Sequence, residues 1–441
     1  MHWFKAQLTR LSSVSLFLLY WLVSLLFSLA NIFPDTYKVA PITYIYVFFM
    51  LMLFLSFYEI GYKYYVVFTV NTRRFITISA HDFENRLRIF EGLALQGEIL
   101  FLLDKYRVGA LNLTYLLTNM LEFNEKLADR STILTTIGVI PQSFRMSAIG
   151  LYLYGSLNGI KYSRSIKVGF VSIIILDILL MIFSANRGAI FFYLGYFLFY
   201  FIYLRDFRKP SRKNIMRILL LAILVCTGAI SYSLFVAKNR IGVSTSANLG
   251  KMQDYNPKYS KYLSGVDYAT IGAISSLYKY LTHEYNYIDA ILKNAKIVNV
   301  AIIPPLGIRI RSQVNKLFPS YVSPSDMELR KIISSSALSS SGWSSMFGLI
   351  VLWFGLAGAF FFIVTLGYVC GLVTKQANTF PTIGRWLLAF LVFNSLALSF
   401  DWIIRDFDQM VCLIVALRYY SVTVGDNFPV LVGEKFPVSC P

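Results

Sequence analysis

Two arginines in this chain lie close to a glycine at the ends of long apolar runs. Arg187 precedes a glycine between the runs 167–185 and 188–205, and Arg240 lies two residues before a glycine, just after the run 215–236. A guanidinium at such a boundary is suited to bind phosphate or pyrophosphate through paired hydrogen bonds. The alternatives are an arginine that reaches toward lipid headgroups, for Arg187, and an anchor beside the membrane, for Arg240.

Further candidates lie in the long polar stretch that follows. Arg309 and Arg311 alternate, so an extended segment would present both guanidinium groups on one side, where a diphosphate fits. The alternative for them is a solvated basic face. His283 and Glu284 are neighbours, and an imidazole beside a carboxylate could act as a general base toward a hydroxyl. The alternative for this pair, and for the similar candidate Asp289, is a satisfied, partly buried polar group.

The sequence offers little to a metal ion or a cofactor. Asp406 and Asp408 have the spacing of acidic pairs that hold metals in some enzymes, but this spacing is common by chance and the first outer loop adds one acid, Asp35. The cysteines are scattered without a Cys-x-x-Cys pair, which indicates neither a disulfide framework nor a zinc site; they are Cys226, Cys370, Cys412 and Cys440. We expect no metal site and no cofactor.

Composition indicates the class of protein that positions these groups. The chain has 441 residues, 56% hydrophobic and 15% charged, with a mean hydropathy of +0.59, whereas soluble domains have roughly 25% charged residues. We predict an all-α polytopic membrane protein. The net charge of +18 is spread over many loops, as in membrane proteins whose inner loops collect lysine and arginine. Nucleic-acid binding is therefore not expected.

Apolar runs of about 20 residues, the length needed to span a membrane, predict the topology. We count ten, with the third interrupted by acids and the last short: 11–32, 40–60, 88–105, 131–155, 167–185, 188–205, 215–236, 343–374, 384–402 and 408–424. The first is long enough to span and lacks a cleavage site for a signal peptide. Basic residues cluster in alternate short loops, which predicts that these loops and both termini are cytoplasmic.

This topology divides the chain into three parts. Seven spans form an N-terminal membrane bundle over 1–236, and three form a C-terminal bundle over 343–441. Between them, 237–342 is a large outer loop, in which basic residues outnumber acidic ones. Its apolar residues recur at three- and four-residue spacing from Ile274 to Leu292, which predicts an amphipathic helix. The basic excess favours an anionic partner, and a loop of this length is usually functional.

The segment after the loop resembles a known family. Ser345-Met-Phe-Gly-Leu-Ile-Val-Leu-Trp-Phe-Gly-Leu-Ala-Gly358 is similar to the Thr-x-Phe-Gly-x-x-x-x-x-Phe-Gly-x-x-Gly segment of the O-antigen polymerases, the Wzy-type oligosaccharide repeat-unit polymerases. Ser184–Gly188 and Asn239–Gly242 are similar to the two arginine–glycine segments of that family. The likeness covers most of the chain in topology and these three stretches in sequence. Ser345 replaces the usual threonine.

The resemblance implies a C-type membrane glycosyltransferase at the outer face of the bacterial inner membrane, working without a metal. It would transfer a glycan from an undecaprenyl-pyrophosphate carrier to a second carrier-linked repeat unit, with membrane lipid and a chain-length regulator as further partners. The pyrophosphate would bind Arg187, Arg240, Arg309 and Arg311, and His283 or Glu284 would take the acceptor proton. Alternatives are an O-antigen ligase and a flippase or transporter for the lipid-linked oligosaccharide, although a transporter usually shows repeated halves.

Overall fold

Most described residues of the long apolar runs are helical. The computed structural model describes residues 17–18, 20–30, 32, 38–63, 75–107, 133–183, 193, 196, 227–228, 231, 268–294, 331–332, 346–379, 382–398 and 407–425, and this part of the chain is mostly helical, as predicted. The predicted runs 188–205 and 215–236 lie almost wholly outside it. The single helices that coincide with predicted runs are α2 (Pro41–Lys63), α3 (Ala80–Arg107), α8 (Arg164–Phe183), α16 (Met346–Thr379), α17 (Ile383–Leu398) and α18 (Phe407–Arg418). A further helix covers Tyr20–Ala30.

The run 131–155, predicted as one span, is instead two helices. α6 (Ile133–Gln142) and α7 (Arg145–Leu157) are separated by a turn at Ser143 and Phe144. Pro141 lies in the last turn of α6, and proline removes a backbone donor and crowds the preceding turn, which favours a break nearby. The hydroxyl of Ser143 donates to the carbonyl of Ile140 and satisfies one of the freed acceptors.

A small sheet was not predicted in a chain expected to be all helical. β1 (Ile76–Ile78) pairs in parallel with β2 (Val422–Val424), with Ile76 opposite Val422. The last predicted run, 408–424, is therefore a helix only to Arg418 and then a turn and a strand. Both strands alternate a β-branched aliphatic residue with threonine, the residue types that strands prefer.

The sheet marks one end of the helical bundle, which we call the sheet end. Ser163, just before α8, binds Glu84 and Arg88 of α3. Gly384 at the start of α17 donates to the carbonyl of Tyr419, after α18. The loops predicted to lie on one side of a membrane thus meet at one end where the structure describes them. Their basic residues there include Lys63, Arg86, Arg88, Lys161, Arg164, Lys167, Lys375 and Arg385.

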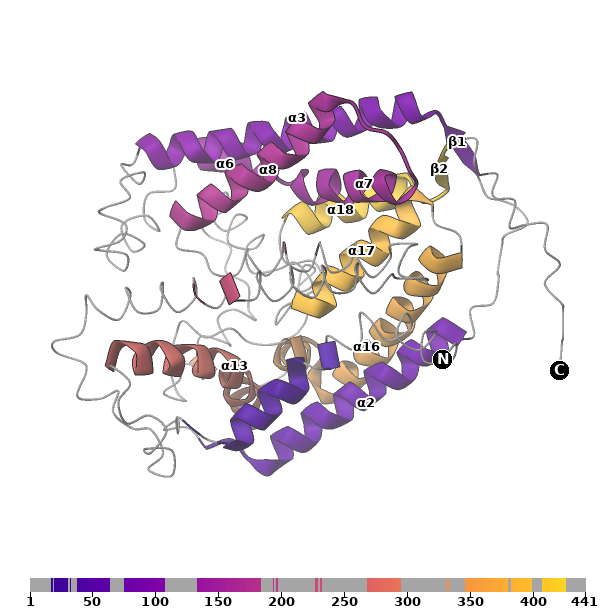
Figure 1. The fold of residues 1–441 in the computed structure, drawn as a ribbon. Coiled ribbons are helices and arrows are strands. Elements are labelled where there is room, and N and C mark those ends of the chain that lie inside the picture. Colours follow the sequence, from indigo (N-terminus) through magenta and orange to yellow (C-terminus); the bar gives the residue numbers. More distant parts are fainter. Residues whose placement is uncertain are drawn as a thin grey trace, which may run out of the picture.

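The helices form two groups joined by α17 (Figure 1). In one group α3 packs on α6, α7 and α8; in the other α2 packs along α16. α17 contacts α7, α16 and α18. α13 (Tyr268–Asn294) packs on α2 and α16 and lies away from β1 and β2 in Figure 1.

α2 and α16 approach closely because glycines line their interface. A Cβ added at Gly367 would lie 2.5 Å from the carbonyl oxygen of Phe54, and one at Gly371 would meet that of Tyr58 more closely still. On the other helix, a Cβ at Gly61 would collide with the carbonyl of Tyr368. Glycines four residues apart that let two backbones touch are a common device of helix pairs in membranes.

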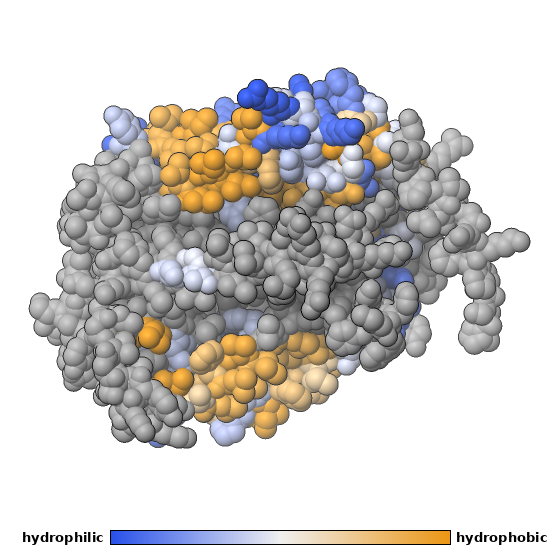
Figure 2. Space-filling view, in the orientation of Figure 1, coloured by the Kyte–Doolittle hydropathy of each residue, from blue (hydrophilic) through white to orange (hydrophobic). Residues whose placement is uncertain are grey.

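Two helices in the described part are long and apolar enough to cross a membrane: α2 and Phe347–Thr379 of α16. Large apolar side chains on α2 face outward, among them Ile45, Phe48 and Met52, which are 62%, 60% and 47% exposed. Figure 2 shows apolar surface over α2 and a second apolar area over the α3–α6 group, with hydrophilic residues beside it. Continuous apolar surface of this kind indicates contact with lipid or with a partner.

Candidate functional site

The helix predicted inside the long loop exists. α13 covers Tyr268–Asn294, which confirms the helix predicted from Ile274 to Leu292. It is more than a surface helix, because every residue from Glu284 to Ile291 is buried. α13 is therefore held in the bundle on several sides, and the carboxylates of Glu284 and Asp289 are carried inside with it.

Asp289 joins α13 to the start of α2. Its side chain is fully buried, and its Oδ1 accepts hydrogen bonds from the backbone N–H of Ala40 at 3.0 Å and from the hydroxyl of Thr43 at 2.6 Å. Its Oδ2 pairs with Nζ of Lys293 at 2.6 Å. The first N–H groups of a helix have no partner within the helix and favour negative charge. Asp289 thus acts as a cap supplied by the long loop.

Glu284 lies deeper along the same helix. It is 3% exposed, and its Oε1 accepts a hydrogen bond from the hydroxyl of Tyr20 at 3.0 Å. Its neighbour Tyr285 donates to the carbonyl of Trp21, and burial raises the pKa of this tyrosine above its ordinary value. Tyr285 therefore remains a neutral donor. His283 is in α13, but its side chain lies outside the described part.

The segment that resembles the polymerases forms the first part of α16 and packs against α13. Phe347 is fully buried, and its carbonyl accepts a hydrogen bond from the hydroxyl of Tyr46. Gly348 faces α13, where an added Cβ would lie 2.9 Å from Cδ1 of Ile291. Gly355 has φ 70° and ψ 177° and interrupts α16, a conformation that essentially only glycine adopts. Gly348 of this segment therefore allows α13 to pack closely, and Gly355 allows α16 to change direction.

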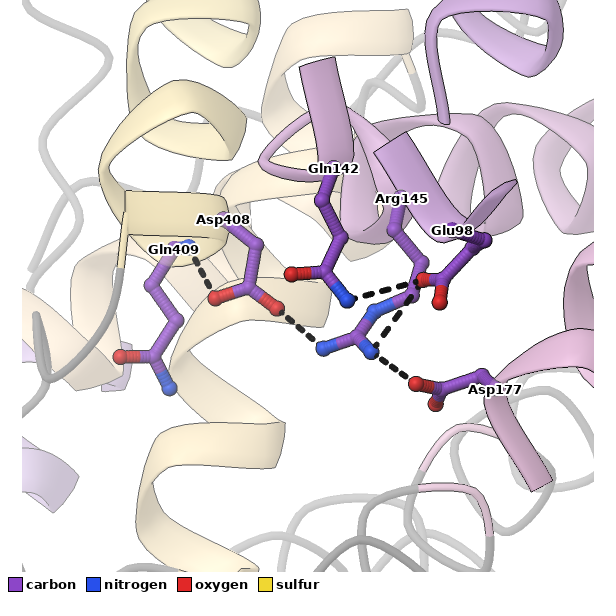
Figure 3. Close-up of polar contacts among 6 residues, drawn as sticks. All are labelled: Glu98, Gln142, Arg145, Asp177, Asp408 and Gln409. Atoms are coloured by element: carbon purple, nitrogen blue, oxygen red, sulfur yellow. Dashed lines mark hydrogen bonds and ion pairs between the residues drawn. The ribbon is translucent and has the colours of Figure 1, made fainter. Parts of the chain in front are cut away.

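A second polar group lies inside the bundle, around Arg145 at the start of α7 (Figure 3). Its guanidinium contacts three carboxylates from three other helices: Nη1 pairs closely with Asp177 of α8 and lies 3.6 Å from Oε1 of Glu98 of α3, and Nη2 lies 3.0 Å from Oδ2 of Asp408 of α18. Gln142 of α6 donates to Glu98 at 3.2 Å. We call these five residues the Arg145 cluster.

The Arg145 cluster is nearly closed to solvent. The side chains of Arg145, Glu98, Asp177 and Asp408 are 19%, 0%, 7% and 12% exposed. Asp408 lies in the first turn of α18, where the helix dipole favours a carboxylate, and its Oδ1 also accepts from the backbone N–H of Gln409 at 3.0 Å. Charged groups buried in an apolar helical bundle are costly, so they commonly mark functional positions.

The structure leaves most of the predicted site outside its described part. Arg187, Arg240, Arg309 and Arg311 lie there, as do the side chain of His283 and the whole of Asp406. Glu284 and Asp289 are described and lie on one helix. Asp408, considered above as half of an acidic pair, binds Arg145. Among the described residues, no three His, Cys, Asp or Glu side chains are arranged to hold a metal ion.

The Arg145 cluster was missed in the sequence because its charged members come from widely separated positions. Glu98 is one of the acids that interrupt the predicted run 88–105, and Asp177 and Arg145 are single charges within apolar runs. Each of these was a usable signal, since a lone charge in such a run requires a partner. Comparison of the chain with known protein families, with curated proteins and with solved structures gave no match.

Proposed function

We propose that this chain is a membrane glycosyltransferase that polymerises undecaprenyl-pyrophosphate-linked oligosaccharide repeat units into a surface polysaccharide such as O-antigen or capsule. The observation that supports it best is the docking of α13. This helix belongs to the long basic loop, and the segment of α16 that resembles the polymerases supplies the glycine against which it packs. The loop is thereby anchored to the helical bundle, as a loop that builds an active site at a membrane face must be.

The membrane arrangement is part of the proposal. The ten apolar runs would cross the bacterial inner membrane, with the sheet end and both termini in the cytoplasm and α13 at the outer face. Two observations favour this. The described basic loops gather at the sheet end, as the positive-inside rule requires, and apolar side chains of α2 face outward along the helix.

The proposed reaction forms one glycosidic bond and breaks one bond to phosphate. A hydroxyl oxygen of the acceptor repeat unit attacks the anomeric carbon of the donor glycan, and the bond from that carbon to the pyrophosphate oxygen breaks. Arg187, Arg240, Arg309 and Arg311 would stabilise the negative charge that develops on the departing undecaprenyl pyrophosphate. His283 or Glu284 would take the hydroxyl proton. A chain-length regulator is a proposed partner.

The gel pattern of lipopolysaccharide or capsule in a strain that lacks the gene tests this function. We expect the strain to keep single repeat units on its lipid core and to lose the ladder of longer chains. Wild type should restore the ladder, whereas Arg187→Ala, Arg240→Ala and His283→Ala should not, at equal protein level. Arg88→Ala, at the sheet end, is the matched control. Loss of the single-unit band as well would contradict polymerisation and indicate ligation or flipping.

A flippase for the same lipid-linked oligosaccharide is the second candidate, and one observation favours it. Arg145 lies at a break between α6 and α7 and is surrounded by carboxylates. Interrupted helices whose ends meet charged groups within the bundle are typical of transporters. The two functions differ in the same strain: loss of a flippase removes every repeat unit from the outer surface, and loss of a polymerase leaves single units.

A further inference from the structure

The Arg145 cluster contains more negative than positive groups. One guanidinium faces three carboxylates, so the fully ionised cluster would have an excess of two negative charges in a nearly closed space. An unpaired buried charge costs several kcal/mol, so such groups usually become neutral instead. Asp408 is compensated further by the N-terminus of α18 and by the N–H of Gln409. The excess charge must therefore be removed at another carboxyl.

Glu98 is the carboxyl with the weakest support for a charge. Its ion pair with Arg145 is the longest of the three, at 3.6 Å, and its other contact is a neutral amide, that of Gln142. Its Oε2 is buried and makes no hydrogen bond with any described residue. The buried hydroxyl of Tyr193 lies beside Asp177, the carboxylate that pairs with the same guanidinium. Within the described part of the chain, Glu98 thus presents an oxygen without a hydrogen bond to a nearly closed polar site.

Glu91 repeats this situation two turns earlier on α3. It is 4% exposed, and its Oε1 makes no hydrogen bond with a described residue. Among the described residues, the charged and titratable groups near it are Arg88, Glu84 and Tyr162. Arg88 is directed to Glu84 and Ser163, and the hydroxyl of Tyr162 donates to the carbonyl of Tyr152. The carboxyl of Glu91 fits against Gly169 of α8 because glycine has no side chain. A Cβ added at Gly169 would lie 2.6 Å from Oε2 of Glu91.

We propose that the carboxyl groups of Glu91 and Glu98 are proton-binding sites and that each holds a proton at neutral pH. Both sites lie on α3, in the interior of the bundle. Each carboxylate takes one proton from water and becomes a neutral carboxyl group, and proton release reverses the step. Binding at Glu98 lowers the excess negative charge of the Arg145 cluster from two to one. The residues are seven apart and share a face of α3. This inference holds for either function proposed above, because it concerns only the groups within the bundle.

Infrared spectroscopy of the full-length protein in lipid vesicles tests the proposal directly, because a protonated carboxyl group has a carbonyl band separate from the carboxylate bands. We expect this band at neutral pH in the wild type. Glu91→Gln and Glu98→Gln should each remove part of it, and the double variant should remove both parts. Glu84→Gln, whose carboxylate pairs with Arg88 at the sheet end, should leave the band unchanged.

A second measurement separates neutral from ionised carboxyl groups in the same cluster. Glutamine has nearly the shape and polarity of a protonated glutamate, so Glu98→Gln should keep the melting temperature of the wild type, whereas Asp177→Asn should lower it. The proposal is overturned if the band is absent at neutral pH or persists in the double variant. It is also overturned if Glu98→Gln unfolds the protein as Asp177→Asn does. The gel pattern of polysaccharide tests the proposed polymerase function separately. Failure of the protonation proposal can therefore be told apart from failure of the proposed function.

Discussion

At the scale of single residues, Arg145 connects helices that are far apart in the sequence. Its guanidinium contacts carboxylates of α3, α8 and α18 from the first position of α7. Such a contact is stabilising only while every partner is present, because removing one member leaves the others buried and unpaired. The broken run 131–155 places this side chain where these helices meet.

We predict that Arg145→Ala destabilises the protein by about 3–5 kcal/mol, the usual consequence of removing one partner from a buried ion pair. Arg145→Lys should recover part of this, since the ammonium keeps the positive charge but is too compact to span the three carboxylates as the planar guanidinium does. Thermal unfolding in detergent measures both. Arg88→Ala, whose side chain is 51% exposed, should cost less than about 1 kcal/mol. Equal melting temperatures for wild type and Arg145→Ala would disprove the role of the cluster.

Asp289 gives a prediction for the contact between the long loop and α2. Asp289→Ala removes the acceptor for Ala40 and Thr43, and loss of such a cap should cost about 0.5–2 kcal/mol and increase hydrogen exchange in α13. Lys293→Ala removes the half-exposed ion-pair partner of Oδ2 but keeps the hydrogen bonds from Ala40 and Thr43 to Oδ1, so it serves as the control. If the amide hydrogens of α13 exchange at the same rate in both variants, Asp289 does not hold α13 in place.

At the scale of elements, the break in α16 determines how the long loop meets the bundle. The residues before Gly355 face α13 and the Tyr20–Ala30 region, through contacts such as those of Phe347 with Trp21 and of Gly348 with Ile291. The residues after it pack along α2 through Gly367 and Gly371. One helix thus serves two different interfaces, and the positive φ at Gly355 allows the change of direction.

We predict that Gly355→Ala destabilises the protein by about 1–3 kcal/mol, the cost of a side chain in a backbone region reserved for glycine. Gly92→Ala in α3 is the matched control. It meets nothing within 4 Å and should be neutral or stabilising by up to about 1 kcal/mol, because alanine favours a helix. Melting temperatures of the two variants decide the point, and a Gly355→Ala protein as stable as Gly92→Ala would contradict the strained break.

The predictable features of the elements were those with a local signature. Apolar runs located the helices, and the spacing from Ile274 to Leu292 located α13. The break after α6 had a signal in Pro141. The contacts of Asp289 with Ala40 and of Arg145 with Asp408 had none, because each joins segments more than 200 residues apart. The strands β1 and β2 are three residues each, too short for alternation to stand out from the flanking sequence.

At the scale of the whole molecule, the bundle has two chemically different ends. The sheet end joins the loops before α3, α8 and α17 and the turn after α18, and it is basic. The α13 region joins the long loop to the starts of α2 and α16. In the proposed topology these ends face opposite sides of the membrane, and the pyrophosphate-binding arginines belong to the α13 side.

Labelling of single cysteines tests this topology. In a background without native cysteines, Lys293→Cys on α13 should react with a membrane-impermeant maleimide in cells whose outer membrane has been opened. Lys161→Cys, exposed at the sheet end, should react only after the inner membrane is broken. Reaction of both residues from the same side would show that the two ends do not lie across a membrane.

The central proposal is that this chain joins lipid-linked repeat units into longer glycans. The most direct measurement uses the purified full-length protein in vesicles, supplied only with undecaprenyl-pyrophosphate-linked repeat units, and follows glycan length and release of undecaprenyl pyrophosphate. We predict products of increasing length, one carrier released for each new linkage, and no activity in Arg187→Ala. Repeat units that change leaflet without growing, or that react only when lipid A core is added, would contradict the claim.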